Sequence, residues 1–422
     1  MTAENFNFNA GLKKKIAIVG IVGVVLLVLG IVFLIFGGGG HAAEGAHGAP
    51  AHGGGHSEFH WYDRLYSNLW INNVFFTGLS VIGLFFVALQ YAAQAGWSVA
   101  IKRIPEAFGA WLPFAGVLML AVFLVGGHTI FHWTHDYLYD ESDPRYDAII
   151  AGKQGYLNYP FYIIRMLVYF GVWYLMYRLI RRESLAEDIN GGVVHYHKMV
   201  KYSTIFIVFF AITSSTSAWD WTLSIDTHWF STMYGWYNFA SWFVSGLAAI
   251  TLVVVLLREN GYITIVSSEH LHDLGKFVFA FSIFWAYIWF SQFMLIYYAN
   301  IPEESIYFLE RLSDDYYAPF FFMNLIMNFF FPFLVLMTRD SKRHTVFLKL
   351  VCTVVLIGQW LNFYLMITPA VLRENGGLGF IELGTTMIYL AAFLFVVLGN
   401  LAKAPLVAKN HPMLQESIHH HT

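Results

Sequence analysis

The sequence predicts an all-α polytopic membrane protein of about ten transmembrane helices. Of its 422 residues, 58% are hydrophobic and only 12% are charged, whereas about a quarter of the residues in globular proteins are charged. Ten long apolar stretches follow one another, and Lys and Arg fall almost wholly in alternate loops between them. Lipid is therefore the expected solvent of most of the chain, because a bilayer core holds no water for unpaired backbone groups.

Each apolar stretch is long enough to cross a hydrocarbon core about 30 Å thick, which takes roughly 20 helical residues. Charge, Gly or Pro bounds each stretch. The expected spans are residues 16–36, 71–93, 109–131, 159–180, 201–219, 236–257, 275–299, 317–338, 345–367 and 380–400.

The first stretch has two interpretations. It follows three lysines as a signal peptide does, but its apolar run of about 21 residues exceeds the usual 7–15. We therefore expect residues 1–36 to form a retained transmembrane helix, with cleavage as the alternative.

Residues 37–60 are expected to be a flexible linker rich in Gly and His, because such a segment cannot bury enough apolar surface to fold. Loose metal binding by its histidines is the alternative. These histidines are His41, His47, His52, His56 and His60. The run His419–His421 is given no role.

The basic residues predict an orientation. Eighteen of the 24 Lys and Arg residues fall on the side that also holds the N-terminus. The positive-inside rule then places both termini in the cytoplasm. The expected location is the cytoplasmic membrane of a bacterium.

The single cysteine, Cys352, limits the cofactors that the chain can hold. One thiol cannot form an internal disulfide, ligate an iron–sulfur cluster or provide a C-x-x-C-H haem attachment. The sequence contains neither a P-loop nor a dinucleotide fingerprint. We expect no cofactor or metal to be bound by this chain alone.

Ionisable side chains inside a span cost a few kcal/mol, so they are by default paired or functional. His128, His132 and His135 leave the third span and are followed by Asp136. Spacings of four and seven place the three histidines on one helix face.

Three further costly residues occupy other spans. Arg165 lies about two turns into the fourth, Asp220 closes the fifth, and Glu382 begins the tenth. The alternating topology places them and His128 toward the outer face, and Asp226 in the next loop joins the candidates. The inner half is expected to be largely apolar, with few ionisable groups.

The histidine cluster has several interpretations. Histidines at i and i+4 can ligate Zn or Cu. A b-type haem usually needs His from two facing spans, and the lack of a second deep His disfavours it and excludes a haem–copper centre. The cluster is either interfacial, with His128 hydrogen-bonded in the bundle, or part of a His–Arg–Asp network that moves protons or meets a quinol. Because quinol oxidation releases two protons, such a site needs a base near an exit.

Amide side chains are frequent in the second half of the chain. Hydrogen bonding between helices is the default interpretation, and a proton wire through bound water is the alternative. A transporter is expected to have helices broken at the membrane midplane, and Pro319 and Pro332 give little sign of that. The amides are Asn238, Gln292, Asn324, Asn328, Gln359 and Asn362.

The outer loops 136–158 and 300–316 are acidic. Glu303, Glu304, Asp314 and Asp315 are the expected docking residues for partner subunits. A solvated face and an acidic collar that gathers released protons are the alternatives.

Two segments resemble a known family. Residues 214–237 (SSTSAWDWTLSIDTHWFSTMYGWY) and 299–305 (ANIPEES), with the ten-span plan, resemble the membrane subunits related to NrfD and polysulfide reductase. Within that family the chain is similar to the second such subunit of bacterial alternative complex III, a quinol:cytochrome c oxidoreductase. The resemblance covers essentially the whole chain, and these two motifs are fairly specific.

The resemblance implies two successive four-helix bundles, spans two to five and six to nine, with spans one and ten outside them. The corresponding domains are residues 61–219 and 220–368, followed by a tenth helix and cytoplasmic tail in 369–422. Implied partners are a sister NrfD-like subunit, an iron–sulfur protein and haem c subunits, often joined to a terminal oxidase. Lipids are the other expected partners, and nucleic acid is not expected.

One departure from the family affects the expected function. The sister subunit is expected to carry a histidine a few residues before the aspartate, where this chain has Thr213 and Ser214 ahead of Asp220. We therefore expect a structural subunit of a quinol-oxidising complex, with proton conduction as a further role and no residue assigned to catalysis. Binding of quinol or menaquinol by this chain itself is the first alternative, and a stand-alone ion or solute transporter is the second.

Overall fold

The structure is a computed structural model that describes residues 5–36 and 60–421. Within these residues, ten helical segments are long and apolar enough to cross a membrane, and the one strand-like pairing is an isolated bridge between Asn5 and Pro405. The prediction of an all-α polytopic membrane protein is confirmed. The predicted linker at 37–60 lies outside the described residues except for His60.

The spans are formed by long helices and, in two cases, by shorter helices in series. The single-helix spans are α1 (Ala10–Phe36), α2 (Trp61–Ala92), α6 (Tyr159–Asn190), α7 (Val194–Trp221), α8 (Tyr234–Glu259), α9 (Ser268–Ala299), α13 (Thr345–Leu372) and α14 (Phe380–Leu401). The third span joins α3 (Arg103–Phe108) to α4 (Leu112–Ile130), and the eighth joins α11 (Tyr317–Leu325) to α12 (Phe331–Val335) through a π-helical turn, η6 (Ile326–Phe330). Short helices outside the spans are α5 (Ala148–Ala151), α10 (Pro302–Leu312) and α15 (Leu414–Ile418).

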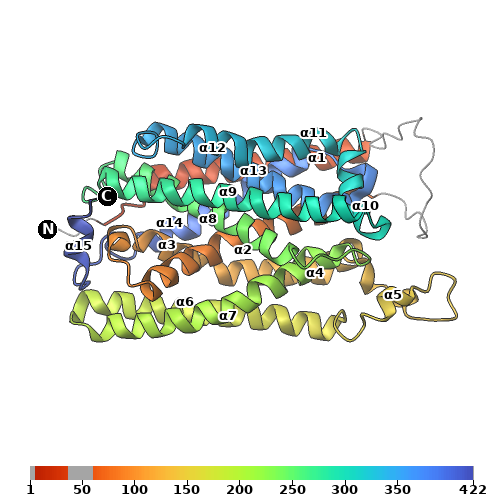
Figure 1. Ribbon diagram of the computed structural model, residues 1–422, viewed down its shortest axis with the longest axis horizontal. Helices are drawn as coiled ribbons and strands as arrows, with labels where there is room; N and C mark the ends of the chain where they lie inside the picture. The colour runs from red at the N-terminus through yellow and green to blue at the C-terminus, as the bar shows by residue number, and fades with distance from the viewer. Residues whose placement is uncertain (1–4, 37–59, 422) are drawn as a thin grey trace.

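The helices pack as two four-helix bundles side by side (Figure 1). In the first bundle α2 contacts α4 and α7, and α6 contacts both of these helices. In the second, α8 contacts α9 and α13, and the eighth span closes the ring. Helices α1 and α14 pair with each other outside the bundles, and α14 also contacts α2.

The two ends of the molecule differ in character. Both ends of the described chain and α15 lie at one end, called here the terminal end (Figure 1). The loops 131–158 and 300–316, with α5 and α10, lie at the other end, called here the acidic end. The loop around α5 projects beyond the rest of the molecule.

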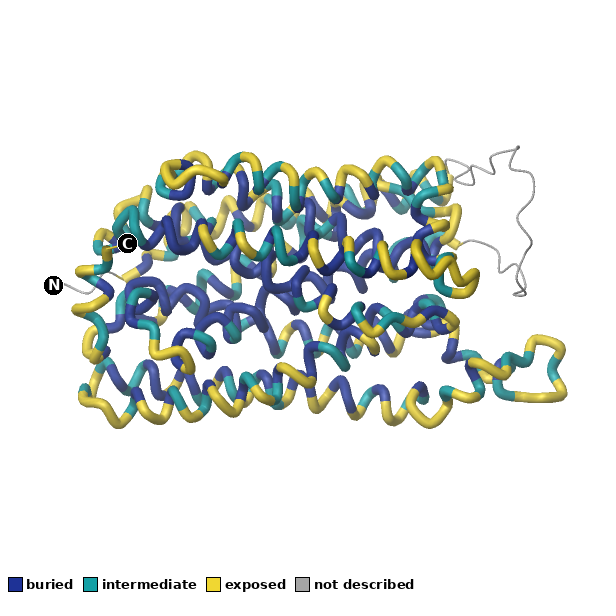
Figure 2. Tube along the Cα trace, in the orientation of Figure 1, coloured by how far each residue is buried: buried dark blue, intermediate teal, exposed yellow. Residues whose placement is uncertain are grey.

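Burial separates central helices from peripheral ones (Figure 2). In the most apolar window of α2 and of α8, 83% of the residues are buried, whereas the figure for α1 is 11%. Close contact between α2 and α8 depends on Gly78, because a Cβ there would lie 2.1 Å from the indole of Trp242. The exposed sides of α1, α6 and α7 are apolar, as lipid contact requires.

Most helices extend beyond the predicted spans. Helix α6 continues to Asn190 and α7 begins at Val194, well outside the expected 159–180 and 201–219. Hydropathy marks only the part of a helix that needs lipid, and the backbone can stay helical beyond it because helical hydrogen bonds do not depend on the solvent. These extensions lie at the terminal end and carry charged residues.

Candidate functional site

Arg165 and Asp220 form a closed ion pair between α6 and α7. Nε of Arg165 donates to one carboxylate oxygen of Asp220 at 2.8 Å, and Nη2 donates to the other at 2.9 Å. Tyr169 donates to the same carboxylate at 3.1 Å, and Nη1 of Arg165 donates to the carbonyl oxygen of Tyr156 at 2.9 Å. Bidentate pairing is strong and specific in geometry. The main role of this ion pair is therefore to hold α6 and α7 together.

The three histidines do not share a helix face, because α4 ends before His132, which lies in a 3-10 turn. The turn still gathers the rings: the centroids of His128 and His135 are 5.4 Å apart, and those of His132 and His135 are 5.7 Å apart. His128 hydrogen-bonds to the hydroxyl of Thr134 at 3.1 Å and to that of Tyr159 at 3.4 Å. The prediction that spacing alone would align them is wrong.

The hydrogen bonds of His128 thus reach neither Arg165 nor Asp220. The side chain of His128 is exposed on the surface of the first bundle, while the ion pair is buried. Partial burial of the ring and the neighbouring His135 lower the pKa of His132. Across residues 5–36 and 60–421, no group of three His, Cys, Asp or Glu side chains is arranged to hold a metal ion.

Glu382 is fixed by the start of its own helix and by α2. Its two carboxylate oxygens accept from Nε and Nη2 of Arg64 at 2.6 and 2.7 Å. They also accept from the amide of Asn68 and from the backbone N–H of Gly379, both at 2.8 Å. A carboxylate in the first turn satisfies free N–H groups and favours the helix dipole, so this residue ties α14 to α2.

The two remaining acidic candidates lie in loops at the acidic end. Asp136 is exposed. Asp226 is half-buried, and burial raises its pKa although Arg311, His228 and Lys153 oppose the shift. Asp226 therefore belongs to a mixed charge group around the end of the second bundle.

The four expected docking residues are at the acidic end, on and beside α10. Glu303 and Asp315 are exposed, while Glu304 and Asp314 are half-buried. Glu303 and Glu304 occupy the first turn of α10, where negative charge favours the helix dipole. Part of this acidic character thus stabilises α10 itself.

A small cavity that the sequence did not reveal lies at the acidic end of the second bundle, with a volume of about 10 Å³, enough for about one water molecule. Arg311 lines it and is only 2% exposed. Its guanidinium lies 3.5 Å from the ring centroid of Tyr307 and donates to three backbone carbonyl groups. The nearest carboxylate is that of Glu310 at 3.9 Å. The signal in the sequence was the helical spacing of Tyr307 and Arg311, which places both on one face of α10.

A hydrogen-bonded line of side chains, called here the polar track, leads from this cavity into the bundle. The Oδ1 of Asn362 on α13 accepts from the hydroxyl of Tyr237 on α8 and from the amide of Asn324 on α11 at 3.1 Å. The amide of Asn362 donates to Ser241 at 2.9 Å, and that of Asn328 donates to Asn324 at 2.6 Å. At 1.5 Å of rise per residue, Asn328 lies about 17 Å from the start of its span.

The polar track ends near the middle of the eighth span, where several hydrogen-bonding groups have no partner. Asn328 lies in the π-turn η6, and its Oδ1 accepts no hydrogen bond. Both amide atoms of the fully buried Gln359 and the Oε1 of Gln292, which lines the cavity, also lack a partner. Such groups normally bind ordered water, and π-turns are frequent at functional sites. Further toward the terminal end α13 presents apolar Val355, with Cys352 behind it.

The sequence did not reveal a group of buried charged side chains that lies outside the predicted spans. A buried group, called here the ion cluster, lies at the terminal end of the first bundle. It consists of Lys102, Arg103, Arg181, Glu106, Glu187 and Asp188. Glu106 pairs with Arg181 at 2.6 Å and with Arg103 at 3.3 Å, and Lys102 pairs with Glu187 at 2.9 Å. These residues escaped notice because α6 continues past its predicted end, and its charges at spacings of three and four face α3.

These groups differ in how far their hydrogen bonds are satisfied. The Arg165–Asp220 and Arg64–Glu382 pairs hold helices together, while the polar track keeps unused donors and acceptors within reach of a cavity. Hydrogen bonds that form a chain polarise one another along its length. A comparison of the chain with models of known protein families finds no match, and a comparison with curated proteins finds none either.

Proposed function

We propose that the chain is an integral membrane subunit of a respiratory quinol:cytochrome c oxidoreductase of the alternative complex III type, in which it is a scaffold and conducts protons. The motifs at 214–237 and 299–305 support the family assignment. The polar track is the observation that carries the proton-conducting role. In this proposal haem c and iron–sulfur clusters belong to partner subunits, beside a sister NrfD-like subunit.

The proposed orientation places the terminal end in the cytoplasm of a bacterium. The excess of Lys and Arg on that side supports it under the positive-inside rule. The acidic end then faces outward, and its exposed carboxylates, among them Glu303 and Asp315, are available to basic surfaces of partner subunits. The projecting loop around α5 offers a second contact on the same side.

Proton conduction is proposed for the outer half of the second bundle. Asn362 is the branch point, since it accepts from two side chains and donates to a third. The fixed charge of Arg311 at the mouth would repel a hydronium ion if it stood alone. Asp226 and Glu310 lie close enough to offset the positive charge of Arg311. Protons released outside can therefore approach the cavity without strong repulsion.

The test of the proposal uses the intact complex, isolated through this chain. We expect haem c and iron–sulfur proteins to copurify, and isolation of the chain alone would contradict the subunit role. In proteoliposomes, Asn362→Leu should lower the number of protons released per quinol while quinol oxidation continues. Asn72→Leu is the matched control, because Asn72 is equally buried but contacts Trp360 and Thr385 outside the polar track. Equal proton yields in both variants would reduce the polar track to a structural role.

Binding of quinol by the chain itself is the second candidate function, and the polar side chains around the Arg311 cavity are the groups that would meet it once they move apart to admit a ring. The guanidinium, two tyrosines and the unpaired Oε1 of Gln292 offer donors and acceptors to a quinol ring. Gln292→Leu should then raise the KM for quinol, whereas proton conduction alone predicts an unchanged KM. A stand-alone transporter finds support only in the π-turn of the eighth span, and isolation of the chain with its partners would exclude it.

A further inference from the structure

The exposed faces of α6 and α7 change from apolar to positively charged toward the terminal end. The two helices run antiparallel, side by side (Figure 1). Spacings of three, four and seven residues place the exposed members of each helix on one face. The apolar members are Val168 and Leu175 on α6 and Ile205, Val208 and Ile212 on α7. The cations beyond them are Arg178 and Arg182 on α6 and Lys198 and Lys201 on α7.

These cations lie at the depth of the lipid headgroups. Hydropathy predicts that the fourth span ends at residue 180 and that the fifth begins at residue 201. Arg182 therefore lies just beyond the apolar part of α6, and Lys198 lies just before that of α7. Long basic side chains at the end of a span extend into the headgroup layer. Phosphate groups are thus the polar groups that these side chains meet.

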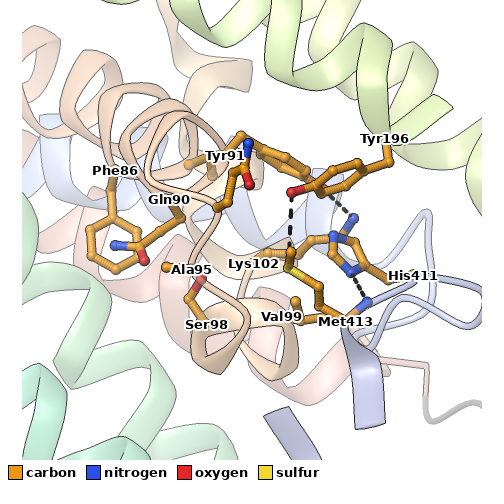
Figure 3. Close-up of a pocket in the computed structure, with 12 residues that line it drawn as sticks. Phe86, Gln90, Tyr91, Ala95, Ser98, Val99, Lys102, Tyr196, His411 and Met413 are labelled. Carbon is orange, nitrogen blue, oxygen red and sulfur yellow. Dashed lines mark hydrogen bonds between the residues drawn. The ribbon is translucent and has the colours of Figure 1, made fainter. Parts of the chain in front are cut away.

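The opposite side of α7 is covered by the C-terminal segment, residues 403–421. The hydroxyl of Tyr196 donates to Sδ of Met413 at 3.9 Å, and the ring centroids of Tyr196 and His411 are 5.6 Å apart (Figure 3). Lys198 follows Tyr196 by two residues, which is a rotation of about 200° around the helix. Lys198 therefore points away from the C-terminal segment and toward lipid.

One buried carboxylate brings cations from the two helices together. Glu183 is 3% exposed, and one of its oxygens accepts from Nη2 of Arg182 at 3.0 Å. The other oxygen accepts from Nδ1 of His195 at 2.7 Å and lies 3.6 Å from Nζ of Lys198. Nε2 of His195 accepts from the amide of Asn190 at 3.1 Å, so the neutral ring carries its proton on Nδ1. The positions of Arg182 and Lys198 are thus fixed relative to each other without a further charge.

Most hydrogen-bond donors of these cations are unused. A guanidinium has five N–H donors, and Arg182 uses one of them for the carboxylate. The 3.6 Å distance of Lys198 is too long for a hydrogen bond, and Lys201 has no bonded or ionic partner in the part of the chain that the structure describes. Arg178, by contrast, donates to the hydroxyl of Tyr174 at 3.1 Å. Arg182, Lys198 and Lys201 are called here the basic site.

The charge of the basic site is not balanced by the described chain. Its three cations share one carboxylate, which leaves two positive charges. At the terminal end of the second bundle Lys349 has a carboxylate of its own, Glu259 at 2.8 Å, and Arg343 has Glu269 at 2.7 Å. A phosphodiester offsets part of the excess and accepts from a guanidinium in its preferred two-pronged geometry. A headgroup with an ammonium group would add another cation, so an anionic lipid fits better.

We propose that the basic site binds the phosphate of an anionic phospholipid with an uncharged headgroup, such as phosphatidylglycerol, in the leaflet at the terminal end. Arg182 donates to the phosphate from α6, the two lysines donate from α7, and the acyl chains lie along Leu175 and Ile205. The inference does not rest on the proposed function, because it concerns a lipid contact of the chain itself.

Native mass spectrometry of the full chain in neutral detergent, with added phosphatidylglycerol, tests the proposal. Phosphatidylglycerol should bind more tightly than phosphatidylcholine. Lys198→Gln and Lys201→Gln should each weaken its binding about fivefold, the usual effect of one cation near anionic headgroups. Arg182→Gln should weaken it at least as much. Lys349→Gln removes the same charge at the same end of the molecule, and as the matched control it should leave the dissociation constant unchanged.

The stability of each variant is measured first. Lys201 has no partner in the described chain, so Lys201→Gln should fold normally and decides the test if Arg182→Gln does not fold. Equal binding of the two lipids, unchanged binding in all three site variants, or an equal loss in Lys349→Gln would overturn the proposal. Glycerophosphoglycerol, the headgroup without acyl chains, should not displace the lipid at millimolar concentration. Displacement would show a site for free phosphate esters and would overturn the assignment to a lipid.

Discussion

Replacing Asp220 by asparagine removes one charge from a pair buried between α6 and α7. The Asp220→Asn side chain keeps nearly the same shape, so the change tests charge rather than packing. Arg165 would keep its bond to the carbonyl oxygen of Tyr156 and its position 3.9 Å from the ring centroid of that tyrosine. It would lose the partner of its two shortest charged hydrogen bonds.

The size of the effect follows from burial, since Asp220 is 1% and Arg165 is 8% exposed. Removing one partner of a buried pair costs about 3–5 kcal/mol, because the other charge remains without compensation. The contacts of Arg165 with Tyr156 offset part of this cost, so we expect a loss of about 3 kcal/mol in the free energy of unfolding. The double variant Arg165→Met with Asp220→Leu removes both charges and should recover most of that loss.

Reversible unfolding in detergent micelles measures these differences. Asp143→Asn is the surface control, because Asp143 pairs with Arg145 in an exposed loop and surface pairs contribute little. We expect the control to unfold like the wild type. A double variant as unstable as the single one would refute the reasoning from unpaired charge. An Asp220→Asn protein of full stability that no longer releases protons would instead make Asp220 a proton carrier.

Two further predictions concern packing and pH. Gly78→Ala should lower the unfolding temperature at a cost of about 1–3 kcal/mol, since the new Cβ would meet Trp242 at 2.1 Å. Gly155→Ala, where a Cβ meets nothing within 4 Å, is its control and should change nothing. His411 should make the docked C-terminal segment sensitive to acid. Its pKa of about 3 in the docked state is depressed below the ordinary value of 6.5, so the released segment binds the extra proton. Between pH 6.5 and 3 docking should weaken by about 1.4 kcal/mol per pH unit. Proteolysis of the segment measures this, and the pH dependence should be absent from His411→Gln.

The sequence predicted the spans well because lipid imposes a simple rule on every residue in the bilayer. Apolar runs of sufficient length must be helical there, and all ten expected spans match helices. The rule stops at the membrane surface, so it said nothing about how far α6 and α7 continue. The ion cluster was missed for that reason: Arg103 and Arg181 were assigned to loops, but they are buried where α3 meets α6.

The position of a residue along the length of its helix was easier to predict than the side chains that it faces on neighbouring helices. The alternating topology placed His128, Arg165 and Asp220 at one depth. In the structure α4 and α7 end and α6 begins at the acidic end, and the three residues lie near these helix ends. Depth does not determine which way a helix is rotated, however. Arg165 and Asp220 face each other, while His128 points to the surface of the bundle. The polar track shows the same limit: its amides were visible, but Arg311 appeared to be an ordinary loop residue.

The central position of α2 has a consequence for how the protein is made. The side-chain oxygen of Asn72 accepts from Trp360, and its amide contacts Thr385, both of which are translated about 290 or more residues later. When α2 leaves the ribosome, α13 and α14 have not yet been made, so this polar face enters the membrane without its final partners. Unsatisfied amides in hydrocarbon are costly. We therefore expect α2 to remain beside the insertion machinery until α13 and α14 arrive. The arrival of these two helices is then the step that commits the chain to its fold.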